Sequence, residues 1–139
     1  MTLIGCVGDD ADGAAYRDQL ARREGINVRA IREIPSAPSG RALIAVDRHG
    51  QNSIVVVAGA NAKLTASAVR AHASHIRRAQ VLLVQLEVPL AAVLEAMRIA
   101  HVADVPIVFN PSPMRADLPC GRIPISTVIV NELEARQVF

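Results

Sequence analysis

The sequence predicts an α/β fold, with a mostly parallel sheet, flanking helices and one antiparallel hairpin. A nearly continuous apolar run over residues 81–89 is typical of a parallel strand buried on both faces. Over residues 26–58, apolar residues recur instead at every second position, as in half-buried strands. Glu87 is then expected at the carboxyl end of a strand, where open α/β sheets bind ligands. The alternative is a carboxylate that only caps the helix opening at Pro89.

Composition limits the class of protein. A chain of 139 residues with 51% hydrophobic and 20% charged residues fits one soluble domain. A formal charge of +2 and 2% aromatic residues argue against a nucleic-acid partner, because single-strand binders stack bases on aromatic side chains. No signal peptide is visible and no apolar run approaches the ~20 residues of a membrane helix, so we expect no membrane partner. Cys6 and Cys120 lack metal-ligand spacing, which suggests reduced thiols in a cytoplasmic protein.

A strand and a helix are expected at the start of the chain. Residues 2–7 are apolar and short enough for a strand. Asp9 or Asp10 can cap a helix over residues 11–24, because a carboxylate accepts hydrogen bonds from the free amides of the first turn. Gly25 supplies the left-handed residue that ends this helix.

An antiparallel hairpin is expected over residues 41–58, after a strand predicted by alternation at residues 26–30. A polar turn that contains a glycine, residues 48–51, separates two alternating segments. The strands 41–47 and 52–58 should therefore pair across it. In a strand with period two, one face then carries Ala42, Ile44 and Val46.

The second half of the chain alternates helices and strands. Helices are expected from Thr65, which can act as its N-cap, and from Pro89, which is favourable at a first helical position. The remaining elements are strands at residues 81–86, 105–109 and 125–130 and a helix at 132–139. These strands lead to Glu87, Asn110 and Asn131, which a parallel sheet places at one edge.

Six short motifs follow one another along the chain. They are Val7-Gly8-Asp9-Asp10, Ser39-Gly40-Arg41-Ala42-Leu43-Ile44, Gly59-Ala60-Asn61, Gln85-Leu86-Glu87, Asn110-Pro111-Ser112-Pro113 and Asn131-Glu132-Leu133-Glu134. In this order and spacing they resemble the ribokinase, or phosphofructokinase-B type, family of carbohydrate kinases. The resemblance covers the whole chain but only the middle portion of such an enzyme. It implies a single partial ribokinase-like domain over residues 1–139, with a lid hairpin inserted at about residues 26–58.

The resemblance implies an ATP-dependent kinase that phosphorylates a sugar such as ribose. It implies that Glu87 lies near the bound sugar and that Ala42 and Ile44 belong to a lid strand that covers it. Asn131 and Glu134 match an Asn-x-x-Glu motif near the nucleotide phosphates, with Glu134 holding Mg²⁺ through water. By themselves, the same two residues also form an N-cap and a capping box with no metal.

Parts of the family's active site have no counterpart in these 139 residues. The family's Gly-Gly-Lys segment, its Gly-Ala-Gly-Asp segment with the catalytic base and anion hole, and its monovalent-cation site are missing. No catalytic residue is therefore assigned, and we expect a fragment or truncated gene product that is inactive alone. The alternative is a non-catalytic remnant of the fold that binds sugar, or that forms a homodimer through the lid strands.

Overall fold

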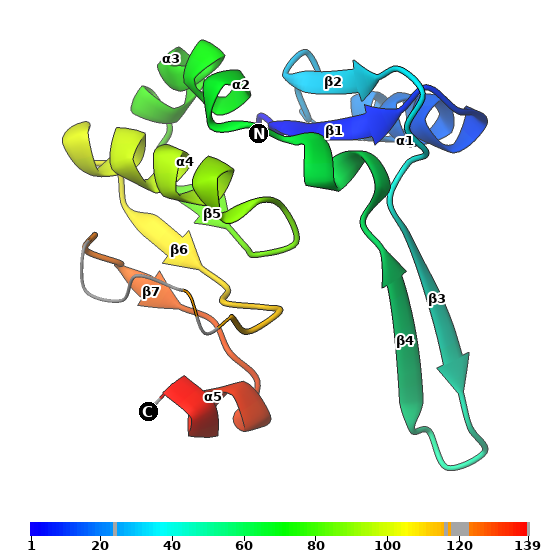
Figure 1. Cartoon of the computed structure of the whole chain (residues 1–139). Helices are drawn as coiled ribbons and strands as arrows, with labels where there is room; N and C mark the ends of the chain where they lie inside the picture. Colours follow the sequence, from blue (N-terminus) through cyan, green and yellow to red (C-terminus); the bar gives the residue numbers. More distant parts are fainter. Residues whose placement is uncertain (24, 116, 118–122, 139) are drawn as a thin grey trace. The chain divides into compact units, whose positions relative to one another are not determined.

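The computed structural model describes residues 1–23, 25–115, 117 and 123–138 (Figure 1). Its contacts divide the chain into two compact units, Met1–Lys63 and Leu64–Phe139. Each unit combines parallel strands with helices, and an antiparallel hairpin belongs to the first, so the chain has the mixed α/β fold that the sequence predicts. The predicted helix ends at Glu24 and Phe139, like Cys120, lie outside the described residues.

The first unit contains a two-stranded parallel sheet and a helix between its strands. Strand β1 (Gly5–Gly8) pairs with β2 (Ile31–Ile34), and helix α1 (Ala11–Arg22) connects them in sequence. Asp10 is the N-cap of α1, and its Oδ1 accepts a hydrogen bond of 2.8 Å from the amide of Gly13. The predicted cap is thus present, and it fixes the point at which the chain leaves β1.

The second strand begins later than the sequence predicts. Residues 26–30 form no strand; Asn27 makes an isolated bridge to Thr2, and pairing resumes only at β2. The Asn27 Oδ1 accepts a hydrogen bond of 3.0 Å from the amide of Arg29, two residues further on. Such a local side-chain bond competes with the sheet ladder, so the alternating pattern does not produce a strand here.

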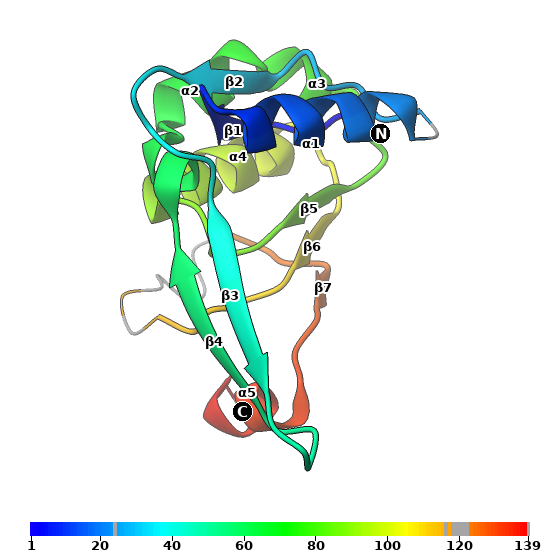
Figure 2. The ribbon, with the colours of Figure 1, turned by 90° about the vertical axis from the view of Figure 1, so that its right-hand side faces the viewer.

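The predicted hairpin is present (Figure 2). Strand β3 (Arg41–Val46) pairs antiparallel with β4 (Asn52–Val57), with Ile44 opposite Ile54. At the turn, Asp47 Oδ1 accepts hydrogen bonds from the amides of residues 49 and 51, at 2.8 and 2.9 Å. The alternating pattern therefore predicts the pairing of these two strands correctly.

Both faces of this hairpin are apolar and exposed. Every residue of β3 and β4 is exposed. On one face Val56 is 65% exposed beside Ala42 and Ile44, and on the other Leu43 is 67% exposed opposite Val55. Apolar surface of this extent usually marks a ligand or protein contact.

The second unit contains a three-stranded parallel sheet in the order β5-β6-β7. Its elements are β5 (Leu82–Val84), β6 (Ile107–Phe109), β7 (Thr127–Val128), and the helices α2 (Ala66–Ala71), α3 (Ala73–Arg77), α4 (Leu90–Val102) and α5 (Glu132–Val138). Helix α4 packs against β5 and β6, and α2 and α3 pack against α4. The buried residues of this unit include Val69, Ile76, Val93, Met97, Ala100, Ile107 and Phe109. Among the described residues, no helix has the length and hydropathy needed to cross a bilayer.

One face of β5 is open, so the prediction of a strand buried on both faces is wrong. Leu83 is 66% exposed, whereas its neighbours Leu82 and Val84 are half-buried. Of the described helices in this unit, α4 is the one that packs on β5, and it covers a single face. An apolar run predicts a hydrophobic strand, but it does not show which element covers each face of that strand.

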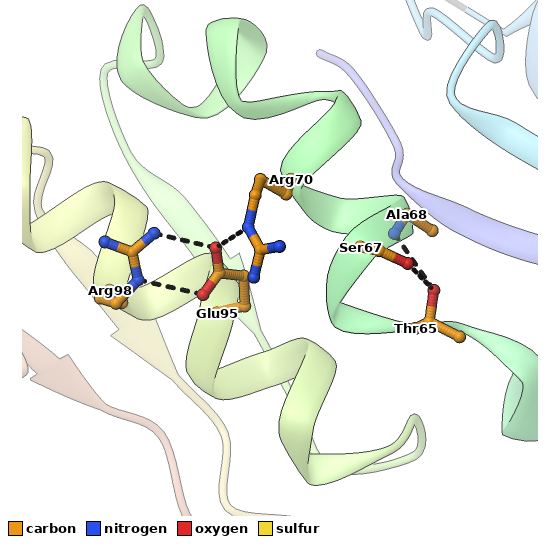
Figure 3. A network of polar contacts seen from close by, with 6 residues as sticks. All are labelled: Thr65, Ser67, Ala68, Arg70, Glu95 and Arg98. Carbon is orange, nitrogen blue, oxygen red and sulfur yellow. Dashed lines mark hydrogen bonds and ion pairs between the residues drawn. The ribbon is translucent and has the colours of Figure 1, made fainter.

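Two short helices replace the single helix expected after Thr65. The predicted cap is present, since Thr65 Oγ1 accepts a hydrogen bond of 3.1 Å from the amide of Ala68 (Figure 3). His72 separates the two helices, as the C-cap of α2 and the N-cap of α3. Ala73 is buried on the far side of this break, so the apolar stripe continues across it.

Glu95 joins α4 to α2 through Arg70, and it also pairs with Arg98 of its own helix (Figure 3). Its carboxylate accepts hydrogen bonds from Arg70 Nε at 2.9 Å and from Arg98 Nε and Nη2 at 3.0 and 2.9 Å. These bonds, that of Arg98 first, lower the pKa of Glu95 to about 2. The carboxylate, whose side chain is 10% exposed, is therefore charged at neutral pH and holds the two helices together.

We expect Glu95→Gln to lower the free energy of unfolding by about 0.5–1 kcal/mol at neutral pH, because both arginines are largely exposed to solvent. The folded pKa lies below the unfolded one, so this contribution is complete above about pH 5 and is lost as the pH falls toward 2. Urea unfolding of wild type and variant near pH 7 and about pH 3 measures it. Glu132→Gln, which removes a well-exposed carboxylate, is the control. An equal difference at both pH values contradicts this role of Glu95.

Candidate functional site

The carboxyl edge of the β5-β6-β7 sheet collects the polar residues that follow its strands. Val84, Phe109 and Val128 are neighbours in the parallel register, so the three strands end side by side. Asn110 follows β6 directly, and its Nδ2 donates a hydrogen bond of 2.8 Å to the carbonyl of Ile129 beyond β7. The predicted convergence of strand ends at one edge is therefore present in this unit.

Glu87 lies in the loop between β5 and α4. Its amide donates a hydrogen bond to Gln85 Oε1, and the buried Leu86 donates through its amide to the Ser112 carbonyl at 3.0 Å. These bonds tie the loop after β5 to the loop after β6. Helix α4 begins at Leu90, one residue later than predicted, with Pro89 as its N-cap. No side-chain hydrogen bond caps this start, so Glu87 does not cap it. Within the described residues, no hydrogen bond or ion pair engages the exposed Glu87 carboxylate, which leaves it available to ligand hydroxyl groups.

Asn131 and Glu134 bind each other at the start of α5. Asn131 Oδ1 accepts a hydrogen bond of 2.8 Å from the Glu134 amide, and Glu134 Oε2 accepts one of 3.0 Å from the Asn131 amide. This reciprocal pair is a capping box, the alternative that the spacing alone left open. In the part of the chain that the structure describes, Oε2 is the carboxylate oxygen with a partner, and Oε1 is left for water or a cation.

The Asn131–Glu134 pair suits Mg²⁺ only as a partner that binds the ion through water. Mg²⁺ usually keeps several waters and takes one or two carboxylates together with substrate phosphates. Glu134 offers one such carboxylate oxygen. Across the described residues there is no group of three His, Cys, Asp or Glu side chains that could hold a metal by itself. The chain thus supplies part of a metal site at most.

Ala42 and Ile44 lie on one face of the hairpin in the first unit. They alternate along β3, opposite Val56 and Ile54 of β4, so four apolar side chains share that face. A surface of this kind excludes water from whatever it contacts. Glu87, Asn131 and Glu134 belong to the second unit.

The sequence did not predict a polar cluster at the base of the hairpin, where the hairpin meets the rest of the first unit. Ser39 donates to Asp10 twice, from Oγ to Oδ1 at 2.6 Å and from its amide to Oδ2 at 2.8 Å. These two bonds, followed by the Gly13 amide, lower the pKa of Asp10 to about 2. The partners are 29 residues apart, so no local spacing reveals them. The available signal is that both residues belong to the motifs quoted above.

Comparison with known proteins identifies relatives of this arrangement. The model of the pfkB family carbohydrate kinases matches residues 1–139. Ribokinase from Mus musculus is 39% identical over 130 residues, which are 93% of this chain and 40% of that protein. A ribokinase structure from Giardia lamblia has a TM-score of 0.84 at 29% identity, over 99% of this chain and 43% of that chain. The ribokinase structure from Arabidopsis thaliana complexed with ribose and ATP has a TM-score of 0.67 at 26% identity, over 78% and 36%. The chain therefore spans less than half the length of each.

Substitution of Glu134 by glutamine separates the capping role from a charge-dependent one. Glutamine accepts the same hydrogen bond in a capping box, so Glu134→Gln should leave amide exchange in α5 nearly unchanged. Asn131→Ala removes the cap itself and should weaken the helix start by about 1 kcal/mol. Hydrogen exchange of the α5 amides measures both. If Glu134→Gln loosens α5 as much as Asn131→Ala does, the carboxylate charge rather than the capping box holds this helix.

Proposed function

The chain belongs to the pfkB family of carbohydrate kinases, and on that premise we propose that it takes part in ATP-dependent phosphorylation of a sugar, with ribose as the first candidate. The observation that carries this proposal is the shared carboxyl edge of the β5-β6-β7 sheet. This edge bears the Glu87 carboxylate, which has no partner among the described residues, and leads to the Asn131–Glu134 pair. The Arabidopsis ribokinase solved with ribose and ATP supports the choice of both substrates.

Glu87 and the hairpin act on the sugar in this proposal. The Glu87 carboxylate accepts hydrogen bonds from sugar hydroxyls and so fixes the orientation of the sugar before phosphoryl transfer. The face that carries Ala42 and Ile44 closes over the sugar and excludes water, which would otherwise compete as the acceptor of the phosphate.

Asn131 and Glu134 act on the nucleotide side. A bound Mg²⁺ would supply charge neutralisation on the ATP phosphates, and Glu134 would help to hold it through water. No Gly-Ala-Gly-Asp segment occurs in the 139 residues, so we assign no catalytic base among them and propose that this chain alone is inactive. A cytoplasmic location, predicted from Cys6 and Cys120, is compatible with ATP as co-substrate.

A second role, self-association, is favoured by the other face of the hairpin. Leu43 and Val55 are opposite each other and exposed there, on the side away from Ala42 and Ile44. We propose that this face packs against the hairpin of a second copy, which would bury apolar surface that is otherwise in water. Such a homodimer also serves a non-catalytic interaction module, the alternative function of this chain.

The kinase proposal predicts ribose phosphorylation by the product of the complete reading frame that encodes these residues. With Mg-ATP, Glu87→Gln should lower kcat/KM for ribose about tenfold to a hundredfold, because a charge-assisted hydrogen bond to the sugar is lost. Glu132→Gln, in which an exposed carboxylate paired with Arg136 is removed, should change little. A coupled assay of ADP release measures both.

Two results would contradict this proposal. Ribose phosphorylation by the isolated 139-residue chain would overturn the assignment of an incomplete active site. Equal kcat/KM values for wild type and Glu87→Gln would remove Glu87 from the sugar site.

The association proposal predicts that the two hairpin faces respond differently to charge. Leu43→Lys should shift the chain toward monomer in sedimentation velocity, because a lysine cannot be buried against a second apolar face without cost. Ile44→Lys is the matched control on the opposite face, and should leave the oligomeric state unchanged. A wild-type protein that stays monomeric at all concentrations, or an equal response to both variants, contradicts the assignment of the Leu43 face.

A further inference from the structure

The base of the hairpin holds polar contacts that none of the roles above uses. We call Gly8, Asp10, Ser39 and Gly59 the hairpin root. Ser39 is only 8% exposed, and its hydroxyl both accepts and donates: it accepts from the Gly8 amide at 2.9 Å and donates to Asp10 Oδ1 at 2.6 Å. The Ser39 amide binds the other carboxylate oxygen at 2.8 Å. The segment that leads into β3 is therefore held by both oxygens of one carboxylate.

Asp10 is itself fixed by the helix that follows it. Its Oδ1 also accepts from the Gly13 amide at 2.8 Å as the N-cap of the 12-residue helix α1. One side chain thus joins the end of β1, the start of α1 and the approach to β3. A movement of Ser39 relative to α1 must break at least one of these bonds.

The backbone is also tightly packed at the hairpin root, where two glycines leave no room for a side chain. A Cβ at Gly8 would lie 2.3 Å from the Ala37 carbonyl oxygen, and one at Gly59 would lie 2.4 Å from the Pro38 oxygen. Gly59 also has a φ of +52°, a backbone conformation that residues with a side chain rarely adopt. The Ala60 amide then donates to the Pro38 oxygen at 2.8 Å. The chain leaving β4 is therefore packed against the chain entering β3.

The strands beyond the root have no comparable support in the described part of this unit. All residues of β3 and β4 are exposed, and the two strands contact chiefly each other. Each strand has six residues, a length of about 20 Å, so a small rotation at the root becomes a large displacement at the turn. The direction of the hairpin is consequently set where Ser39 meets Asp10.

We propose that Asp10 and Ser39 are positioning residues, which hold the hairpin root against α1 so that the face with Ala42 and Ile44 can close over the sugar. The position of the root stands on the geometry above, and the closure over sugar rests on the proposed function. Either serine or threonine at residue 39 can make both side-chain contacts, because its hydroxyl accepts from the Gly8 amide and donates to Asp10. Alanine at residue 39 leaves the Gly8 amide without this acceptor and removes one of the three hydrogen bonds that Asp10 accepts.

Hydrogen exchange on the product of the complete reading frame tests the root without relying on activity. Ser39→Ala should accelerate exchange of the Gly8 amide, and of the hairpin as a whole, on the order of tenfold. Asp10→Asn should do likewise, since an amide nitrogen cannot accept from Ser39. Ser39→Thr keeps the hydroxyl and should stay near wild type. Asp18→Asn, an exposed carboxylate of α1 paired with Arg22, is the control.

Steady-state kinetics of the same variants tests the positioning role. Ser39→Ala should raise the KM for ribose on the order of tenfold and leave the KM for ATP unchanged, whereas a merely unstable enzyme would lose kcat with both KM values intact. Unchanged exchange in Ser39→Ala, or faster exchange with an unchanged KM for ribose, overturns the proposal. If wild type phosphorylates no sugar, the proposed function fails, and the exchange result alone decides whether Asp10 and Ser39 hold the hairpin.

Discussion

The carboxylate of Asp10 is the interaction on which the first unit depends. It accepts three hydrogen bonds of 2.6–2.8 Å, from the Gly13 amide in the first turn of α1 and from both donors of Ser39. The resulting pKa of about 2 keeps this carboxylate charged in neutral solution, so it remains an acceptor for all three donors. A hairpin with no buried residue in β3 or β4 needs such a junction, because packing does not orient it. Arg41 adds a weaker, exposed contact there through Asp12.

The second unit depends instead on the parallel pairing of β5, β6 and β7. Because the strands are parallel and in register, the chain leaves each of them at the same edge. Two bonds then connect the loops: Leu86 to Ser112 and Asn110 to Ile129. The Glu87 carboxylate takes no part in these two bonds, and the Asn131–Glu134 pair caps α5. A carboxylate that has no partner among the described residues, at the edge where such sheets bind ligands, is the physical basis for proposing that Glu87 contacts substrate.

The sequence predicted elements where a local pattern determines them and failed where distant contacts do. The hairpin was predicted because alternation on both sides of a polar turn fixes register locally. The strand at residues 26–30 was misplaced because a side-chain bond from Asn27 interrupts the pattern. The burial of Leu83 was wrong because hydrophobicity does not identify a covering element. The Asp10–Ser39 pair could not be predicted, since its 29-residue separation carries no periodic signal. The Asn-x-x-Glu spacing did not distinguish a capping role from a metal-binding role, because both roles need the two side chains on the same turn of a helix.

The central claim is that the hairpin, fixed at its root, closes over a sugar. Hydrogen exchange of the β3 and β4 amides, measured on the product of the complete reading frame with and without ribose, tests it most directly. We predict slower exchange across the hairpin when ribose is bound, with the root already protected in both states. Ribose binding that is detected by calorimetry but leaves exchange in β3 and β4 unchanged would contradict the claim.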